Sequence, residues 1–113
     1  MKRKFIFTQN FDDKWSKLGF TDEDCALLEQ FLLENPEVGV IMQGTGGIRK
    51  LRWALPSTGK SGGIRILYID YIVQETIVVF DLFTKNEKDN LSDSERAALK
   101  SIVKSLGKEL SNG

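Results

Sequence analysis

A basic, glycine-rich stretch from Gly44 to Tyr71 carries the residues of this chain that are best suited to chemistry. It contains six of the ten glycines and five cations, with no acid before Asp70. The cations are Arg49, Lys50, Arg52, Lys60 and Arg65. Two strand-like runs flank a Gly/Ser/Thr loop, and lysine and arginine side chains on such a surface suit a polyanion.

Cations on neighbouring strands are spaced so that they can converge. Lys50 and Arg52 project from one face of a predicted strand, about 7 Å apart on strand geometry. Arg65 opens the next predicted strand, and Lys85 and Lys88 follow the strand after that. A solvated, charged sheet face is the alternative. Such faces usually alternate cations with acids, and this stretch does not, which favours a polyanion site.

The chain has no histidine and one cysteine, Cys25. The lack of histidine excludes Ser-His-Asp and Cys-His catalysis, histidine-based RNase chemistry and most zinc sites. Cys25 lies in an apolar helical run, which indicates a buried thiol and fits a reducing compartment. Asp70 and Asp81 follow apolar runs and could hold a metal, but the cations around them argue against it. We therefore predict no metal and no cofactor.

A phosphate-loop pattern is met only in its loosest form, from Ala54 to Gly59-Lys60-Ser61. The strict pattern has a glycine at the first position and a helix directly after the loop. Here the sequence continues as an Ile- and Leu-rich strand from Ile64. Without a helix N-terminus the phosphates would lose much of their binding device. We interpret this stretch as a connection between strands.

The remaining pattern predicts an α+β fold with the element order β-αα-ββββ-α and a largely antiparallel sheet packed against helices. One domain, residues 1–113, is expected from the length. Capping-box patterns at Thr21/Asp24 and Ser92/Glu95 mark two helix starts, and Asn10 marks a third. Strands are predicted over residues 3–8, 38–43, 48–55, 64–71 and 76–84, the last being the most apolar and the expected centre of the sheet.

Charge is balanced over the whole chain but not locally. Residues 1–47 carry five basic and eight acidic side chains, and residues 48–88 carry seven basic and four acidic ones. Such a dipolar molecule favours a specific docked site over loose polyanion binding. No signal peptide and no apolar run of membrane-spanning length is found. We expect a cytoplasmic protein that does not contact a membrane.

Three blocks of this sequence resemble the HigB group of the RelE superfamily, the toxins of bacterial type II toxin–antitoxin pairs. The blocks are Gly44–Arg52 (GTGGIRKLR), Gly59–Tyr68 (GKSGGIRILY) and Lys85–Leu91 (KNEKDNL). Each block alone is weak, but their order and spacing together are specific. The resemblance implies a RelE-like fold over the whole chain.

The resemblance also implies an enzyme: a ribosome-dependent, metal-independent mRNA endonuclease (mRNA interferase) that inhibits translation. In such enzymes the RNA 2′-hydroxyl attacks the adjacent phosphate. Lys50 and Arg52 match the paired cations of the family's central strand, Arg65 the arginine of the next strand, and Lys85 or Lys88 the cation after the last strand. Converging cations stabilise the charge that develops on the pentacoordinate phosphate. Lys50, Arg52, Arg65 and Lys85 are the predicted catalytic residues.

The predicted RNA-binding residues are Arg49, Lys60, Tyr68 and Lys88. The well-known RelE enzymes carry a C-terminal tyrosine that packs on RNA, whereas no tyrosine follows Tyr71 here. Tyr68, Tyr71 or Trp53 would have to supply stacking. The implied partners are a HigA-like helix-turn-helix antitoxin and the 70S ribosome with mRNA in its A site. The alternatives are a non-enzymatic, ParE-like gyrase inhibitor and a non-catalytic nucleic-acid-binding protein on the same fold.

Overall fold

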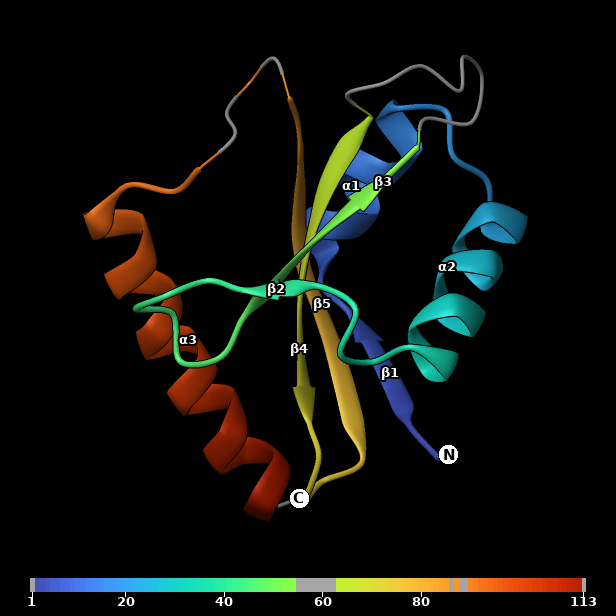
Figure 1. Ribbon diagram of the computed structural model, residues 1–113. Helices are drawn as coiled ribbons and strands as arrows, with labels where there is room; N and C mark the ends of the chain where they lie inside the picture. Colours follow the sequence, from blue (N-terminus) through green and yellow to red (C-terminus); the bar gives the residue numbers. More distant parts are fainter. Residues whose placement is uncertain (1, 55–62, 86, 88–89, 113) are drawn as a thin grey trace.

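The computed structural model describes residues 2–54, 63–85, 87 and 90–112 (Figure 1). Its elements are β1 (Lys4–Phe7), α1 (Gln9–Lys17), α2 (Asp22–Glu34), β2 (Val40–Ile41), β3 (Arg49–Trp53), β4 (Ile64–Tyr71), β5 (Thr76–Thr84) and α3 (Asp93–Asn112). The predicted β-αα-ββββ-α order and the α+β class are confirmed. Within the described residues, none of the helices has the length and apolar character needed to cross a membrane.

The five strands form one sheet in the order β1-β5-β4-β3-β2. β1 runs parallel to β5, and the other three pairings are antiparallel, so the largely antiparallel sheet is confirmed. The expectation that Thr76–Thr84 is the central strand is wrong, because β1 adds outside β5 and leaves β4 in the middle. β5 is still paired on both edges and buried on both faces, which explains its apolar run.

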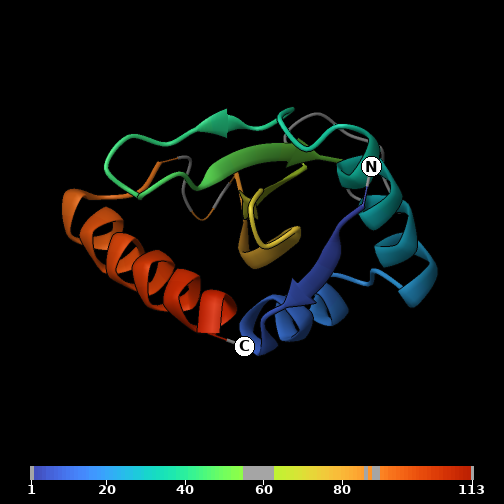
Figure 2. The ribbon, with the colours of Figure 1, turned by 90° about the horizontal axis from the view of Figure 1, so that it is seen from below.

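Helices cover both faces of the sheet, with α3 on one side and α1 and α2 on the other (Figure 2). Alternate side chains of β4 enter two separate cores. Ile64, Ile66 and Tyr68 pack in the core under α1 and α2. Leu67 and Ile69 pack in the core under α3, together with Met42, Ile48, Phe83 and Val103. The face to which a strand residue points therefore decides which helix layer it meets.

Polar caps set where the helices begin. Thr21 and Asp24 form the predicted capping box of α2. Ser92 and Glu95 form the one before α3: the Ser92 N–H donates to Glu95 Oε1 (2.9 Å) and the Glu95 N–H donates to Ser92 Oγ (3.2 Å). The predicted start of the first helix at Asn10 is wrong, because the hydroxyl of Thr8 accepts the Phe11 N–H and caps α1.

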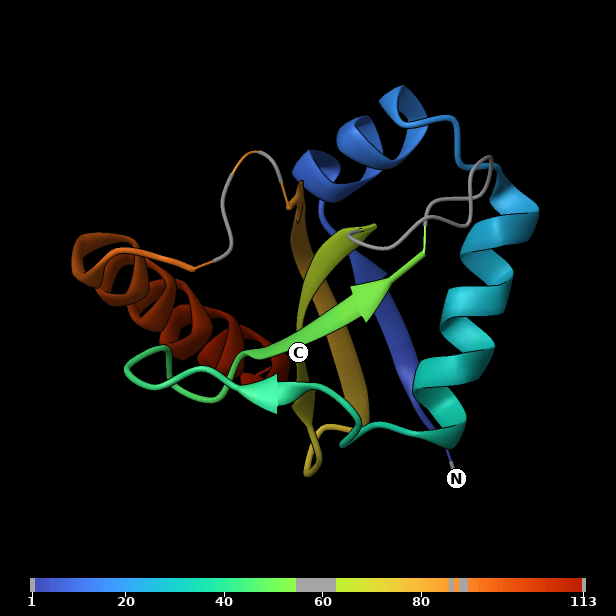
Figure 3. The same ribbon diagram turned by 45° about the horizontal axis from the view of Figure 1, so that its top comes forward.

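The predicted strand over residues 38–43 shrinks to the two residues of β2, which pair with β3 at the edge of the sheet. Val40 and Ile41 are 72% and 49% exposed, so burial adds little to hold a longer strand. The chain leaves the sheet at a turn closed by buried Thr45, whose hydroxyl donates to Met42 O (2.7 Å) and accepts the Ile48 N–H (3.0 Å). Figure 3 shows this turn reaching across to α3.

The Gly-Lys-Ser stretch is followed by β4, which begins at Ile64. The strand predicted to begin at Ile64 is therefore confirmed, while the interpretation of the Gly-Lys-Ser stretch as a strand connection stays a prediction. Residues 55–62 themselves lie outside the described residues.

Candidate functional site

The register between β3 and β4 places three of the predicted catalytic cations on one face of the sheet. Lys50 pairs with Leu67, and Arg52 pairs with Arg65. Paired residues in an antiparallel ladder point to the same side. Leu67 belongs to the core under α3, so all three cations lie on the α3 face. The Cβ atoms of a directly opposed pair such as Arg52 and Arg65 are about 5 Å apart.

The three cations differ in depth. Arg52 is exposed and Lys50 is half-buried, whereas Arg65 is only 2% exposed. Arg65 lies between β3 and β5, where it also pairs with Phe83. A ligand arriving from solvent would meet Lys50 and Arg52 first. Arg65 adds positive charge from below, in a less polar setting where Coulomb interactions are stronger.

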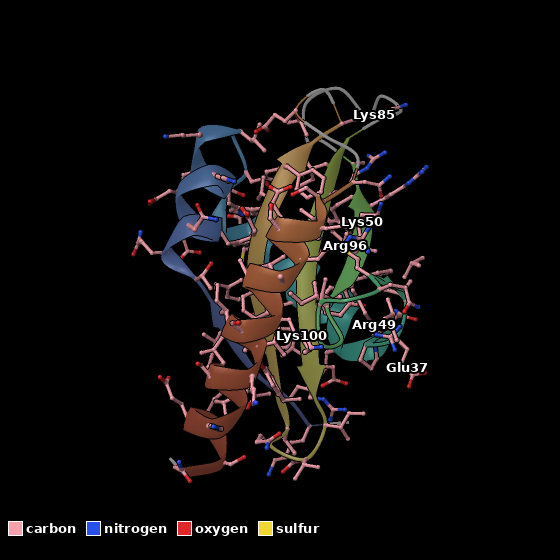
Figure 4. The ribbon with its side chains drawn as sticks, turned by 90° about the vertical axis from the view of Figure 1, so that its left-hand side faces the viewer. Glu37, Arg49, Lys50, Lys85, Arg96 and Lys100 are labelled. Carbon is pink, nitrogen blue, oxygen red and sulfur yellow. The ribbon has the colours of Figure 1, made fainter. Side chains whose placement is uncertain are left out.

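The start of α3 brings two further polar residues to Lys50. Lys50 Nζ donates to Asn90 Oδ1 at 3.4 Å. Arg96, which is also labelled in Figure 4, donates from Nη1 to Gln43 O (2.7 Å) and from Nε to Leu91 O (3.3 Å), the carbonyl next to Asn90. Arg96 thereby ties the loop before β3 to the segment before α3, which also holds the Lys50 partner Asn90.

Sequence reasoning missed Asn90 and Arg96. Their positions around the Ser92–Glu95 capping box indicate only a polar helix start. What makes them part of the site is the placement of that helix start against the β2–β3 turn, which lies nearly fifty residues earlier in the chain. A local pattern carries no signal for that contact.

The remaining predicted cations lie elsewhere. Lys85 directly follows β5, is exposed, and lies beyond Lys50 towards the end of the sheet in Figure 4. Lys60 and Lys88 lie outside the described residues. Lys85 therefore extends the cationic surface towards the end of the sheet at which β3 and β5 end and β4 begins.

Arg49 and Tyr68, predicted to bind RNA, face away from this site, so the structure does not bring them together with Lys50 and Arg52. They pair with each other on the α2 face. Arg49 Nη1 donates to Gly39 O (2.8 Å) and Glu37 O (3.1 Å). Tyr68 is fully buried; its hydroxyl donates to Pro36 O (2.9 Å) and accepts the Gly39 N–H (2.9 Å). A buried ring offers no face to a nucleobase. Both side chains hold the connection from α2 to β2.

The acids that were considered as metal ligands serve as ion-pair partners. Asp70 Oδ1 lies 2.7 Å from Arg3 Nε, and Asp81 Oδ1 lies 2.8 Å from Lys14 Nζ. In the part of the chain that the structure describes, no three His, Cys, Asp or Glu side chains are grouped as metal ligands would be. The side chains gathered on the α3 face are thus suited to binding an anion.

The chain is thus a small α+β domain whose five-stranded sheet gathers Lys50, Arg52 and Arg65 on one face. The family model described as the RelE toxin of the RelE/RelB toxin–antitoxin system matches residues 6–112. This chain therefore belongs to the RelE toxin family, and the superfamily assignment is confirmed.

Solved structures of E. coli RelE share the fold. A mutant RelE in the free state superposes with a TM-score of 0.58 at 19% identity, covering 87% of this chain and 96% of that one. Isolated RelE gives 0.52 at 20% identity, covering 90% and 99%. A chain of the intact RelBE toxin–antitoxin complex gives 0.52 at 19% identity, covering 73% and 94%. At this identity the likeness establishes the fold.

Proposed function

We propose that this protein is the toxin of a type II toxin–antitoxin pair and cleaves mRNA on translating ribosomes. Membership of the RelE toxin family supports the general role. The observation that carries the enzymatic role is the placement of Lys50, Arg52 and Arg65 on one face by the β3–β4 register. The Gly44–Arg52, Gly59–Tyr68 and Lys85–Leu91 blocks favour the HigB group within the family.

The proposed reaction is an internal transesterification. The 2′-hydroxyl oxygen attacks the adjacent phosphorus, a 2′,3′-cyclic phosphate forms, and the 5′-oxygen leaves with a proton. Negative charge builds up on the phosphate oxygens in the transition state. Cations that are fixed in place before the reaction stabilise this charge more than they stabilise the bound substrate.

Each cation has a proposed task in this reaction. Arg52 is exposed, and its guanidinium fork suits two phosphate oxygens. Lys50, held towards Asn90, is the candidate for handling the 2′ proton. Buried Arg65 raises the positive potential behind Arg52. For Lys85, which is exposed at the end of β5, the proposed task is to contact the leaving side of the RNA or the next phosphate.

The proposed partners follow from the same assignment. The E. coli structure named as the intact RelBE complex pairs a RelE toxin with its antitoxin. We propose that this chain likewise has a cognate antitoxin, a HigA-like helix-turn-helix protein, and acts on the cytoplasmic ribosome with mRNA in the A site.

The test is a cleavage assay on purified translating ribosomes with a defined mRNA, read by primer extension. Wild type should cut within codons. Lys50→Gln and Arg52→Gln should each lower the cleavage rate about 100-fold, the loss typical of removing one preorganised charge stabiliser. Lys17→Gln, an exposed lysine on α1, is the control and should cut normally. Intact mRNA with damaged DNA in cells expressing the wild type would instead indicate a gyrase inhibitor.

A further inference from the structure

Four cations follow one another at every fourth position of α3: Arg96, Lys100, Lys104 and Lys108. On an α-helix this spacing forms a stripe about 18 Å long that drifts by roughly a third of the circumference. The three lysines are exposed. The stripe starts next to the candidate site, because Arg96 donates to the carbonyl of Leu91, the residue that follows the Lys50 partner Asn90.

Beyond its first turn, this helix carries its acids and its cations on different sides. Glu95 and Glu109 project from one side and the cations from the other, with the buried residue Val103 facing the sheet between them. Asp93, in the first turn, is the acid that lies on the side of the cations. Beyond the stripe, the exposed positions on its outer side are Ala97, Ser101 and Ser105. Small and hydroxyl-bearing residues allow close approach to a backbone and can donate to phosphate oxygens.

The three lysines make no ion pair with the described residues, where the ion pairs are Arg3–Asp70 and Lys14–Asp81. Acids at a spacing of four from each lysine would have neutralised the stripe. Positions four residues before and after Lys104 are instead lysines. Like charges at this spacing destabilise a helix by a few tenths of a kcal/mol per pair, so a bound polyanion would relieve the repulsion.

We propose that this α3 stripe is the surface by which the protein docks on double-helical ribosomal RNA. The inference rests on the proposed ribosomal function and adds a second, non-catalytic contact. The buried centre of a protein interface is usually rich in apolar side chains, whereas beyond Asp93 in the first turn the stripe and its outer side hold lysine, arginine, alanine and serine. Phosphate contacts position a protein on a helical nucleic acid without reading sequence. Docking by α3 would present Lys50 and Arg52 to the mRNA.

The test measures binding to 70S ribosomes without mRNA by co-sedimentation, from low to physiological salt. The stripe variant is Lys100→Gln/Lys104→Gln/Lys108→Gln. The matched control is Lys2→Gln/Lys4→Gln/Lys17→Gln, which removes the same charge at exposed positions on other elements. Each lost phosphate contact reduces the slope of log affinity against log salt by about 0.9, so the stripe variant should lose about 3 units of slope.

Selective weakening of the stripe variant, with the control unchanged, supports the proposal. Equal loss in both variants, no loss in either, or no ribosome binding by wild type overturns it. If the stripe lysines are needed only for binding the antitoxin, the surface docks a protein and the proposal is wrong. The cleavage assay decides the proposed function separately, since a wild type that docks through α3 but cuts no mRNA refutes only that function.

Discussion

Neighbouring residues of one type take different tasks because a strand sends alternate side chains to opposite layers. Arg49 points to the α2 face, where two backbone carbonyls hold its guanidinium. Arg52 points to the α3 face and is exposed. Both are arginines in a five-residue strand, yet one holds a loop and the other is free to meet an anion. Counting every cation in a basic stretch therefore overstates the number of residues in a site. Only the cations whose side chains point to the same face of the sheet should be counted.

Tyr68→Phe separates a structural role from a role in stacking. The variant leaves Pro36 O and the Gly39 N–H, both held by the buried hydroxyl, without that partner. Stability should fall by about 1–3 kcal/mol, the cost of unsatisfied buried groups, while ribosomal cleavage is unchanged. Urea denaturation and the cleavage assay provide the two readouts.

Tyr71→Phe is the matched control for this prediction. Its hydroxyl donates to a single carbonyl, Val103 O, at 2.7 Å on the other face of the sheet. The loss of stability should therefore be smaller than for Tyr68→Phe. A cleavage defect in Tyr68→Phe at wild-type stability would show that the ring has a direct part in the reaction after all.

The alternation of side chains along a strand predicted which cations share a face of the sheet, but it did not predict how deeply each side chain is buried. That Lys50 and Arg52 point to the same face of the sheet follows from the local strand pattern. The burial of Arg65 and Tyr68 depends on β5 and on residues 36–39, which lie against them from distant parts of the chain. An Arg or Tyr in a strand has the same local pattern whether its tip reaches water or the interior.

At the scale of elements, the accuracy of the predicted bounds follows the strength of the local cause. β4 and β5 match the predicted residues 64–71 and 76–84, because long apolar runs ended by turn residues fix them. β2 does not match, because a weakly buried edge strand is limited by the turn that Thr45 closes. The capping boxes were predicted because both partners lie within four residues of each other.

Ser92→Ala tests whether the start of α3 supports the site. Losing the side-chain cap of Glu95 N–H should cost about 1 kcal/mol. Fraying of this turn should also loosen Asn90 and Arg96, which lie against Lys50 and the β2–β3 turn. Cleavage should therefore slow several-fold. The readouts are urea denaturation and the single-turnover rate on ribosomes.

Thr21→Ala removes the equivalent cap from α2 and is the control for Ser92→Ala. Its cost in stability should be similar, since both residues accept an N3 backbone N–H. Its effect on cleavage should be absent, because α2 covers the other face of the sheet (Figure 2). Equal cleavage by the two variants would mean that the start of α3 does not position the site.

Over the whole molecule, the predicted dipole takes the form of two unlike faces. The acids of the first half gather in the first turns of α1 and α2, including Asp12, Asp22, Glu23 and Asp24. Lys50, Arg52 and Arg65 lie on the other face of the sheet, as does α3 with its cations. The last 25 residues carry equal numbers of acids and cations, which hid the α3 stripe in the sequence totals. Only the helical arrangement reveals that, beyond Asp93 in the first turn, the acids and the cations of α3 lie on different sides of the helix.

Alkaline pH should destabilise the whole molecule, because the folded state raises the pKa of a thiol and of two tyrosines that lie on opposite faces of the sheet. Burial and the nearby carboxylates of Glu29, Asp12 and Asp22 raise the pKa of the Cys25 thiol to about 11. Burial also raises the pKa of Tyr68 and Tyr71. These groups lose their protons more readily when unfolded. Their contribution to stability is therefore complete below about pH 9 and is lost progressively as the pH rises to about 11.

Cys25→Ala isolates one part of this pH dependence. Two pKa units correspond to about 2.7 kcal/mol, and solvent screening of the partly exposed thiol reduces the expected contribution to about 1 kcal/mol. The free energy of unfolding, measured in urea at pH 7 and pH 10.5, should fall less in Cys25→Ala than in wild type by that amount. The packing cost of the substitution is present at both pH values and cancels in the difference. An equal or larger fall in the variant would show that the folded state does not hold the Cys25 proton more tightly than the unfolded chain does.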